Sequence, residues 1–569
     1  MRDKFIYLLA LLLAVSVGYF VVEPYWKLYE GCSNKDFLSW DGNLRFIQSI
    51  RFSSELKNFE IIDAIFRVLD TPTWPPMRML LSSPIVLIFG ADPTKDIFLT
   101  LVTFLILVFT FILILIDFGT PVILWIIGGF IFPVFLFLNQ NFITYTFSPM
   151  LELQGGLFFI LSIYYFYKWN REQSKRNSIL LGIFSFLLYF TKYPYGYIFV
   201  FISFLFLLVL ETESVIFFGI RYIVLSVKKF RPILFMILVL VSLKFIPIDA
   251  KIATHIKFFT FLIGFLDITH FIYSRKEEHR KMGYQKIISL FQMILLPILV
   301  WTFSHPDRFR SSNGTLNHIQ SEGKMVGMVV EKNLSYYSDF FQALFFEGWE
   351  KNFGILLLVV TTISFIYSII QYRKNKNLSF SFLAGFFLFA SLIIMTIITE
   401  NHQSRHVYHL IPTLALIIFM GKGWKYNSWF LAIFSLVVIW ISLTKEINKS
   451  NVCFSSNAPV YEIPRFFLKE SREKLNKPAY LLNRIEEFHY NHADLELVAA
   501  RVSYEKDISL SIFKTELKAK QDKIEQILSI GRSCDNRVMV PVILSAKRDW
   551  KEVYRKEQED KSACLQIYE

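Results

Sequence analysis

The chain has 569 residues, of which 54% are hydrophobic and 19% are charged, and its mean hydropathy is +0.43. These values exclude an ordinary soluble protein, which needs more charged residues to cover its surface. The net charge of +13 does not indicate a nucleic-acid partner, because the basic residues gather in short loops between apolar segments. We therefore expect a polytopic membrane protein that binds no nucleic acid.

About thirteen apolar segments are candidates for membrane-spanning helices, since a bilayer core of ~30 Å requires about 20 residues in a helix. The first is long for a signal peptide and lacks a small-residue cleavage site, which favours a retained span. The fifth and sixth are separated by a short turn and form either two spans or one re-entrant pair. The expected spans are 4–22, 96–116, 120–138, 149–168, 177–191, 194–210, 231–248, 256–273, 286–303, 353–370, 378–398, 408–420 and 427–444.

Lys and Arg residues in the short loops set the expected orientation. With a cytoplasmic N-terminus, the inner segments hold 20 of these residues, including the basic loop from Arg221 to Arg231, and the short outer loops hold 5. Residues 78–90 are apolar but short and contain Pro84, so we interpret them as an interfacial helix. An odd number of spans then places the C-terminal segment outside the cytoplasm.

The expected fold is an all-α membrane domain over 1–445, with interfacial helices in a first outer loop at 23–95, and a soluble extracytoplasmic α/β domain over 446–569. In the second domain the segments 478–488, 496–504, 538–544 and 563–569 are typical of short strands, and the charged stretch from Phe513 to Ile530 is typical of a helix. Residues 304–352 form a further long outer loop.

The four cysteines all fall in segments assigned to the outer side, namely Cys32, Cys453, Cys534 and Cys564. An oxidising compartment permits disulfides there. Four cysteines allow three pairings, and the sequence leaves disulfides and unpaired thiols equally open.

Two acidic residues of the first outer loop are candidates for catalysis. Asp41 lies in the run Ser-Trp-Asp-Gly-Asn, and Asp70 precedes Trp74 and a Pro-Pro pair. An acid at the membrane surface is suited to accept a proton from an attacking hydroxyl while the apolar part of the substrate stays in lipid. The competing interpretation is a solvated loop residue or helix cap, which is the common fate of loop acids.

The order of these motifs resembles the GT-C superfamily of membrane glycosyltransferases, in the bacterial branch related to protein O-mannosyltransferases and the lipid A aminoarabinose transferase. The resemblance covers about residues 1–445. It implies that Asp41 is the essential acid of the first loop and that Trp74 stands where many members have His. Gly42 replaces the Glu of the mannosyltransferases, which favours the divergent envelope transferases.

Three later residues extend the resemblance. Glu152 opens the fourth span, where members often have a second acid, and its alternative role is a capping carboxylate. Lys192 in Thr-Lys-Tyr-Pro and Arg405 before Tyr408 match positions that the resemblance implies in phosphate binding. For Lys192 the alternative is contact with ordinary phospholipid head groups.

We thus expect a hexosyl- or pentosyltransferase that moves a sugar from a polyprenyl-phosphate donor to an envelope acceptor, which is a lipid, glycan or protein. Asp41 and Glu152 are the expected catalytic residues, and Lys192, Arg405, Trp74 and Asp70 are expected to bind substrate. No metal site is predicted and no cofactor is required, although a divalent metal stays open. The expected location is the bacterial inner membrane, with the C-terminal domain in the periplasm.

Two other classes of function compete with this one. A transporter or flippase of a lipid-linked glycan would carry polar residues near the middle of its spans, whereas here the candidate residues gather at the outer surface. A sensor would need far fewer spans to anchor its domain. Motifs for nucleotide, zinc-protease or Cys-pair chemistry are absent from the sequence.

Overall fold

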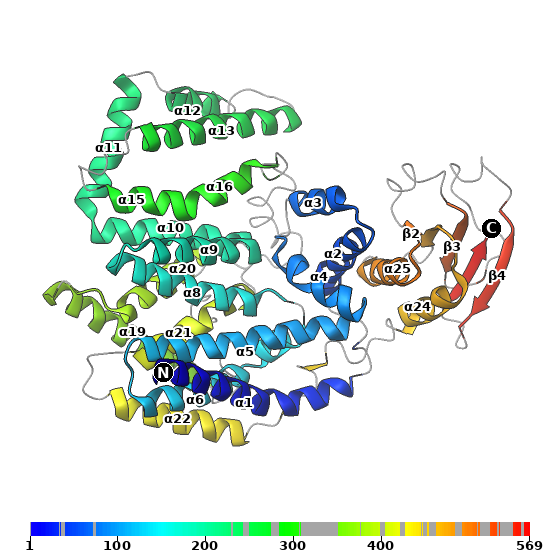
Figure 1. The fold of residues 1–569 in the computed structure, drawn as a ribbon, viewed down its shortest axis with the longest axis horizontal. Coiled ribbons are helices and arrows are strands. Elements are labelled where there is room, and N and C mark those ends of the chain that lie inside the picture. Colours follow the sequence, from blue (N-terminus) through cyan, green and yellow to red (C-terminus); the bar gives the residue numbers. More distant parts are fainter. Residues whose placement is uncertain are drawn as a thin grey trace.

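A bundle of long helices and a small α/β domain make up the protein, and the domain lies at one end of the bundle (Figure 1). The computed structural model describes residues 2–32, 35, 40–71, 75–148, 150–228, 232–242, 250–274, 284–305, 308, 351–375, 377–398, 404–420, 427–444, 447, 452–453, 462–483, 492–508, 510–511, 524–531, 534, 550–558 and 563–569.

The bundle helices are rich in Leu, Ile, Phe and Val, and in a bilayer a helix satisfies every backbone polar group within its own segment. Five described helical segments are long and apolar enough to cross a membrane: Phe5–Glu30, Pro93–Asp117, Tyr193–Leu210, His255–Ser274 and Gln285–Phe303. These observations confirm a helical integral membrane domain, whereas the number of thirteen spans stays a prediction. The bundle comprises α1 (Arg2–Glu30), α5 (Pro93–Asp117), α6 (Val122–Leu138), α8 (Glu152–Arg171), α9 (Lys175–Thr191), α10 (Tyr193–Leu210), α12 (Pro232–Ser242), α13 (Ala250–Ser274), α15 (Gln285–Leu290), a π-helical segment η1 (Phe291–Leu295), α16 (Leu296–Phe303), α19 (Lys351–Asn375), α20 (Phe380–Ile398), α21 (Ile411–Met420) and α22 (Asn427–Thr444).

The chain reverses sharply between α9 and α10. α9 ends at Thr191 and α10 begins at Tyr193, so Lys192 alone forms the connection. A Cβ atom on Gly196 would lie 2.4 Å from Cβ of Tyr189, and glycine therefore permits the two helices to approach closely here. The structure thus resolves this region as two separate helices of 17 and 18 residues.

One segment that the sequence analysis assigned to a basic loop is a helix. α11 (Thr212–Lys228) contains Arg221 and runs across the direction of the bundle helices, at the end far from the C-terminal domain (Figure 1). Its 17 residues span only about 25 Å at ~1.5 Å per residue. Its exposed apolar side chains, which include Ile216, Phe217 and Ile220, are typical of a helix that lies in the membrane surface.

The first outer loop contains three short helices, and a buried ion pair joins the last of them to α5. These helices are α2 (Trp40–Lys57), α3 (Ile61–Leu69) and α4 (Met77–Phe89), and α4 confirms the helix expected at 78–90. Arg78 Nη2 lies 2.6 Å from Asp96 Oδ2, and Arg78 Nη1 donates to Thr100 Oγ1 at 3.0 Å. Arg78 and Asp96 are both buried, so this pair fixes α4 against the start of α5.

The C-terminal domain is a mixed α/β fold, as expected. Its five-stranded sheet has the order β2-β1-β3-β5-β4, in which β1 pairs in parallel with β2 and β3 and β5 pairs antiparallel with β3 and β4. The elements are α24 (Glu462–Lys474), β1 (Ala479–Asn483), α25 (His492–Lys506), β2 (Leu510–Ser511), β3 (Gln526–Gly531), β4 (Glu552–Glu557) and β5 (Cys564–Tyr568).

Two assignments of secondary structure in this domain were wrong. Residues 496–504 belong to helix α25, in which Leu495, Val498 and Val502 are buried at helical spacing. The stretch expected to be helical up to Ile530 contains β3, whose six residues are all buried. A short apolar run does not by its periodicity separate a buried strand from a helix. Residues 538–544 lie outside the described residues.

Two disulfides pair the four cysteines. Cys32 at the end of α1 is bonded to Cys453, and Cys534 is bonded to Cys564 at the start of β5. The first bond therefore ties the C-terminal region to the first outer loop. Helix α25 packs against α2.

Polar contacts strengthen the packing of the C-terminal domain on the loop helices. Arg51 Nη2 in α2 lies 2.8 Å from Glu496 Oε1 in α25. The Tyr504 hydroxyl of α25 donates to the carbonyl oxygen of Val86 in α4 at 3.0 Å. The helices of the first outer loop are thus enclosed between the bundle and the C-terminal domain.

Candidate functional site

A buried ion pair lies where α8 begins. Glu152 Oε1 is 3.5 Å from Lys192 Nζ, and the two side chains are 3% and 16% exposed. Glu152 occupies the first turn of α8, where the positive end of the helix dipole favours an anion. A carboxylate withdrawn from water needs a cationic partner, and Lys192 supplies it. The sequence motifs around Glu152 and Lys192, which are 40 residues apart, therefore meet at one place.

Glu152 keeps one acceptor atom available at this place. Its Oε2 atom is buried and has no hydrogen-bond partner within the described part of the chain. Both polar atoms of the buried Gln154 side chain also lack a hydrogen-bond partner within the described residues. A buried carboxylate oxygen gains from any donor brought to it, so Glu152 is suited to bind a hydroxyl group.

A short 3-10 helix, η4 (Ser404–Leu410), packs against α8 beside this pair. The His409 ring of η4 stacks on the Tyr195 ring of α10 with centroids 3.7 Å apart. A Cβ atom on Gly155 would lie 2.6 Å from the Tyr195 ring, so glycine is needed at the contact. Arg405 belongs to η4, and this packing brings the backbone of its segment next to the start of α8.

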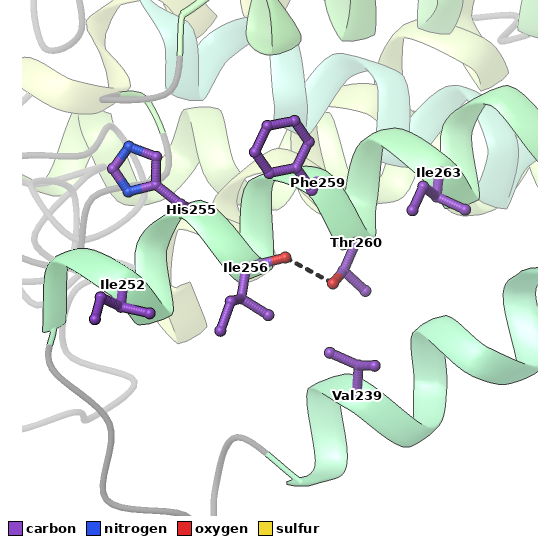
Figure 2. A pocket seen from close by; sticks show the side chains of 7 residues that line it. All are labelled: Val239, Ile252, His255, Ile256, Phe259, Thr260 and Ile263. Atoms are coloured by element: carbon purple, nitrogen blue, oxygen red, sulfur yellow. Dashed lines mark hydrogen bonds between the residues drawn. The ribbon is translucent and has the colours of Figure 1, made fainter.

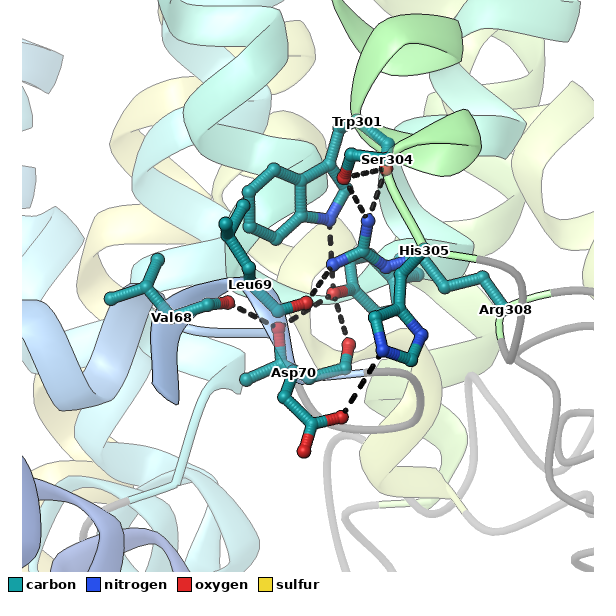
Figure 3. A network of polar contacts seen from close by, with 9 residues as sticks. Val68, Leu69, Asp70, Trp301, Ser304, His305 and Arg308 are labelled. Carbon is teal, nitrogen blue, oxygen red and sulfur yellow. Dashed lines mark hydrogen bonds and ion pairs between the residues drawn. The ribbon is translucent and has the colours of Figure 1, made fainter. Parts of the chain in front are cut away.

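A second polar network joins the first outer loop to the segment after α16 (Figure 3). Asp70, the C-cap of α3, lies 3.5 Å from His305 Nε2. Arg308 Nη2 donates to the carbonyl oxygen of Leu69 at 2.6 Å, and its guanidinium lies 4.1 Å from the centroid of the Trp301 ring. Arg308 thus anchors the end of α3 to α16.

Tyr193 connects this network to Lys192, its neighbour in the chain. The Tyr193 hydroxyl donates to the carbonyl oxygen of Thr71 at 2.8 Å and accepts from Trp301 Nε1 at 3.2 Å. The turn between α9 and α10 therefore contacts Glu152 through Lys192 and contacts the first outer loop through Tyr193. The Glu152–Lys192 pair and the polar network of Asp70, Arg308 and Tyr193 lie in one region, at the end of the bundle that faces α2, α3 and α4.

Arg308 is the charged residue of this region that the sequence analysis did not select. It is 3% exposed, and burial lowers the pKa of its guanidinium below the ordinary value. The ordinary pKa of arginine is so high that the guanidinium stays protonated at neutral pH. In the sequence, only the position of Arg308 shortly after an expected span indicated a role in the site. Other basic residues share this position, so it did not single out Arg308.

The structure places only part of the candidate set. Glu152, Lys192 and Asp70 are described in full, and the first two are in contact. Asp41 is the second residue of α2 and Arg405 lies in η4, but their side chains lie outside the described residues, as does Trp74 entirely. Their proposed contacts with substrate stay predictions.

Within the part of the chain that the structure describes, neither a metal-ligand cluster nor the apolar cavity of the bundle belongs to this region. Among the described residues, no group of three or more His, Cys, Asp or Glu side chains is arranged to hold a metal ion. An apolar cavity of about 520 Å³ lies between α12 and α13 (Figure 2). The hydroxyl of its Thr260 donates to the carbonyl oxygen of Ile256 at 2.6 Å, and the cavity shares no lining residue with either polar network.

The fold and this region together define an integral membrane protein with a buried ion pair and a polar network at one end of its helix bundle. No protein-family model matches the chain, and no curated protein matches it. Among solved structures, the chain is similar to the crystal structure of ArnT from Cupriavidus metallidurans bound to undecaprenyl phosphate. The TM-score is 0.49 at 9% identity, and the match covers 98% of this chain and 97% of that chain.

A TM-score below 0.5 at 9% identity transfers neither that protein's activity nor its ligand to this chain. The function is therefore argued from the chain's own residues.

Proposed function

We propose that this chain is a membrane glycosyltransferase that moves a sugar from a polyprenyl-phosphate donor to an envelope acceptor on the extracytoplasmic face. The observation that carries the proposal is the buried pair of Glu152 and Lys192, seated beside η4 at the end of the bundle that faces the first outer loop. A cation and an acid at the membrane surface suit a substrate with a phosphate and a sugar above an apolar tail.

The proposed reaction is a single displacement with inversion. The acceptor hydroxyl oxygen forms a bond to the anomeric carbon, and the bond from that carbon to the phosphate oxygen breaks. The phosphate leaves with the electron pair, and the carboxylate of Asp41 takes the proton from the hydroxyl. No cofactor is required, and a chelator tests whether a divalent metal assists the departing phosphate.

Lys192 and Arg405 are proposed to stabilise the charge that develops on the leaving phosphate. Preorganised cations contribute most where charge forms in the transition state. Glu152 has two roles in this proposal: it holds the Lys192 ammonium in place through Oε1, and it orients a hydroxyl through Oε2. Asp70 and Trp74 complete the proposed substrate contacts at the edge of the first outer loop.

The first prediction concerns Asp41. Asp41→Asn keeps the side-chain volume but removes the proton acceptor, so we expect transfer from a synthetic polyprenyl-phosphate sugar to fall about 10²–10⁴-fold. Asp63→Asn is the matched control, because Asp63 is an exposed acid of α3 in the same loop. Normal expression of both variants with Asp41→Asn within threefold of wild type would leave Asp41 without a catalytic role.

A deletion strain separates this proposal from a transporter. We expect mass spectrometry of its envelope lipids and glycans to show the loss of one sugar substituent and the accumulation of its lipid-linked donor. Unchanged glycans, with the lipid carrier redistributed across the membrane, would favour a flippase.

A further inference from the structure

A second cavity lies at the other end of the bundle. It has a volume of about 760 Å³ and is enclosed by the N-terminal part of α1, the last turns of α5 and α8, and the segment that begins α9. The N-terminus of α1 lies at the end of the bundle far from the C-terminal domain (Figure 1). The cavity is therefore separate from the Glu152 region.

The lining of this cavity changes from apolar to charged along the helix axes. Phe109 and Leu113 of α5 are followed by Asp117, and Leu161 of α8 is followed by Lys168. Eight residues from Phe109 to Asp117 correspond to about 12 Å along a helix. A bilayer changes in the same order, from its hydrocarbon core to its head groups. The cavity is thus suited to an amphiphile that lies parallel to the bundle.

The charged half of the lining contains both positively and negatively charged side chains. Lys168 Nζ lies 2.9 Å from Asp117 Oδ1, and these side chains are 31% and 37% exposed. Glu172 and Arg176 also line the cavity, are exposed, and make no ion pair with another described residue. Two cations and two carboxylates favour a ligand group that itself carries one positive and one negative charge.

We infer that this cavity binds a membrane phospholipid with a phosphoethanolamine head group. The phosphate is placed to accept hydrogen bonds from Lys168 and Arg176, and the primary ammonium to donate to Asp117 and Glu172. A purely anionic head group has no positive charge to pair with the two carboxylates, which would repel it. A quaternary ammonium carries no N–H group for these acids.

The apolar half of the cavity holds the upper part of the acyl chains. Tyr7 of α1 and Tyr164 of α8 line the wall together with Phe109 and Leu113. Aromatic side chains with a polar tip are typical of the boundary between hydrocarbon and head groups. This half distinguishes a membrane lipid from the same head group free in solution.

Native mass spectrometry of the full chain tests the site. The protein is exchanged into detergent with equal amounts of three phospholipids that share their acyl chains and carry phosphoethanolamine, phosphocholine or phosphoglycerol head groups. We expect the phosphoethanolamine lipid to be retained about fivefold more than either other lipid, because it alone offers ammonium N–H groups to Asp117 and Glu172, and one such exposed ion pair contributes about 1 kcal/mol. Equal retention, or a preference for phosphoglycerol, would overturn the inference.

Two neighbouring basic residues provide a matched pair of variants. Arg176 lines the cavity and Lys175 does not, and both side chains are exposed. Arg176→Gln is expected to lower retention of the phosphoethanolamine lipid about fivefold, whereas Lys175→Gln leaves it unchanged. Equal effects of the two variants would show attraction by surface charge alone and would contradict a site.

Soluble glycerophosphoethanolamine distinguishes the source of the head group. Because it lacks acyl chains, we expect it not to displace the lipid at equal concentration. Displacement would show that the apolar wall contributes nothing, and the assignment to a membrane lipid would be wrong.

Discussion

Glu152 depends on Lys192, because its carboxylate is 3% exposed and would otherwise be a charge withdrawn from water. Removing one member of a buried pair costs about 3–5 kcal/mol, whereas replacing both members together is often nearly neutral. This asymmetry separates the structural role of the pair from its proposed role in transfer.

The second prediction uses this asymmetry. We expect Lys192→Met to lower the unfolding temperature in detergent clearly, and Lys192→Met combined with Glu152→Gln to restore most of it. Transfer is expected to be lost in both, because neither keeps the cation that stabilises the phosphate. A double variant with normal stability and normal transfer would make the pair purely structural.

The third prediction tests whether Lys192 and Arg405 bind the same phosphate. Each neutral substitution alone should reduce the transfer rate, and the double substitution should cost less than the sum, since the second loss acts on a disabled site. Arg405→Lys should also be impaired, because lysine lacks the planar fork of arginine. Two independent head-group contacts would instead give small, additive effects of about 1 kcal/mol each.

At the scale of elements, helix α24 is joined to the edge strand β4 through one buried acid. Glu470 accepts from Lys556 Nζ and from the Tyr554 hydroxyl, both at 2.6 Å. Burial alone would raise the pKa of Glu470, but these two hydrogen bonds outweigh it and the pKa lies below the ordinary value. Because β4 is largely exposed, this contact adds to the pairing of β4 with β5 in supporting the edge strand.

The fourth prediction follows from the sign of that shift. A carboxylate with a lowered pKa in the folded state stabilises it above the unfolded pKa of about 4.3, and this contribution is lost as the pH falls through the folded pKa. We expect Glu470→Gln to speed hydrogen exchange in residues 552–557 at pH 7, by about tenfold for ~1–2 kcal/mol. The difference from wild type should shrink below pH 4. Glu473→Gln, a change at an exposed position of α24, is the control and should leave the exchange of β4 unchanged at both pH values.

At the scale of the whole molecule, the disulfide between Cys32 and Cys453 and the contacts of α25 with α2 place the C-terminal domain on the helix that carries Asp41. A domain docked there limits access to the first outer loop. The end of the bundle that carries the Glu152 region is therefore also the end covered by the domain.

The fifth prediction concerns the compartment of that end. The ratio of 20 to 5 basic residues between the two sets of loops predicts that the C-terminal domain lies outside the cytoplasm. A phosphatase fused after residue 569 should be active, and a reporter that requires the cytoplasm should be silent there. The reverse pattern would contradict the topology and the proposed extracytoplasmic reaction together.

The sequence by itself determined the features that depend on local composition. The long apolar runs required helices, since lipid offers no partner for backbone groups, and the short run with Pro84 became α4. The Thr-Lys-Tyr-Pro motif indicated Lys192, and the acid at the start of the fourth expected span indicated Glu152. Composition did not reveal α11, because an apolar segment that is interrupted by Arg221 and followed by basic residues also fits a loop.

Only the tertiary structure decided which of these residues meet. The contact of Glu152 with Lys192 joins motifs 40 residues apart, and Arg308 reaches Leu69 across 239 positions. Distant segments also meet in the disulfide between Cys32 and Cys453 and in the packing of α25 on α2. The strand at 526–531 likewise depends on its pairing with other strands. Such contacts depend on how helices and strands pack in space, and a periodic pattern along one segment carries no information about its partner.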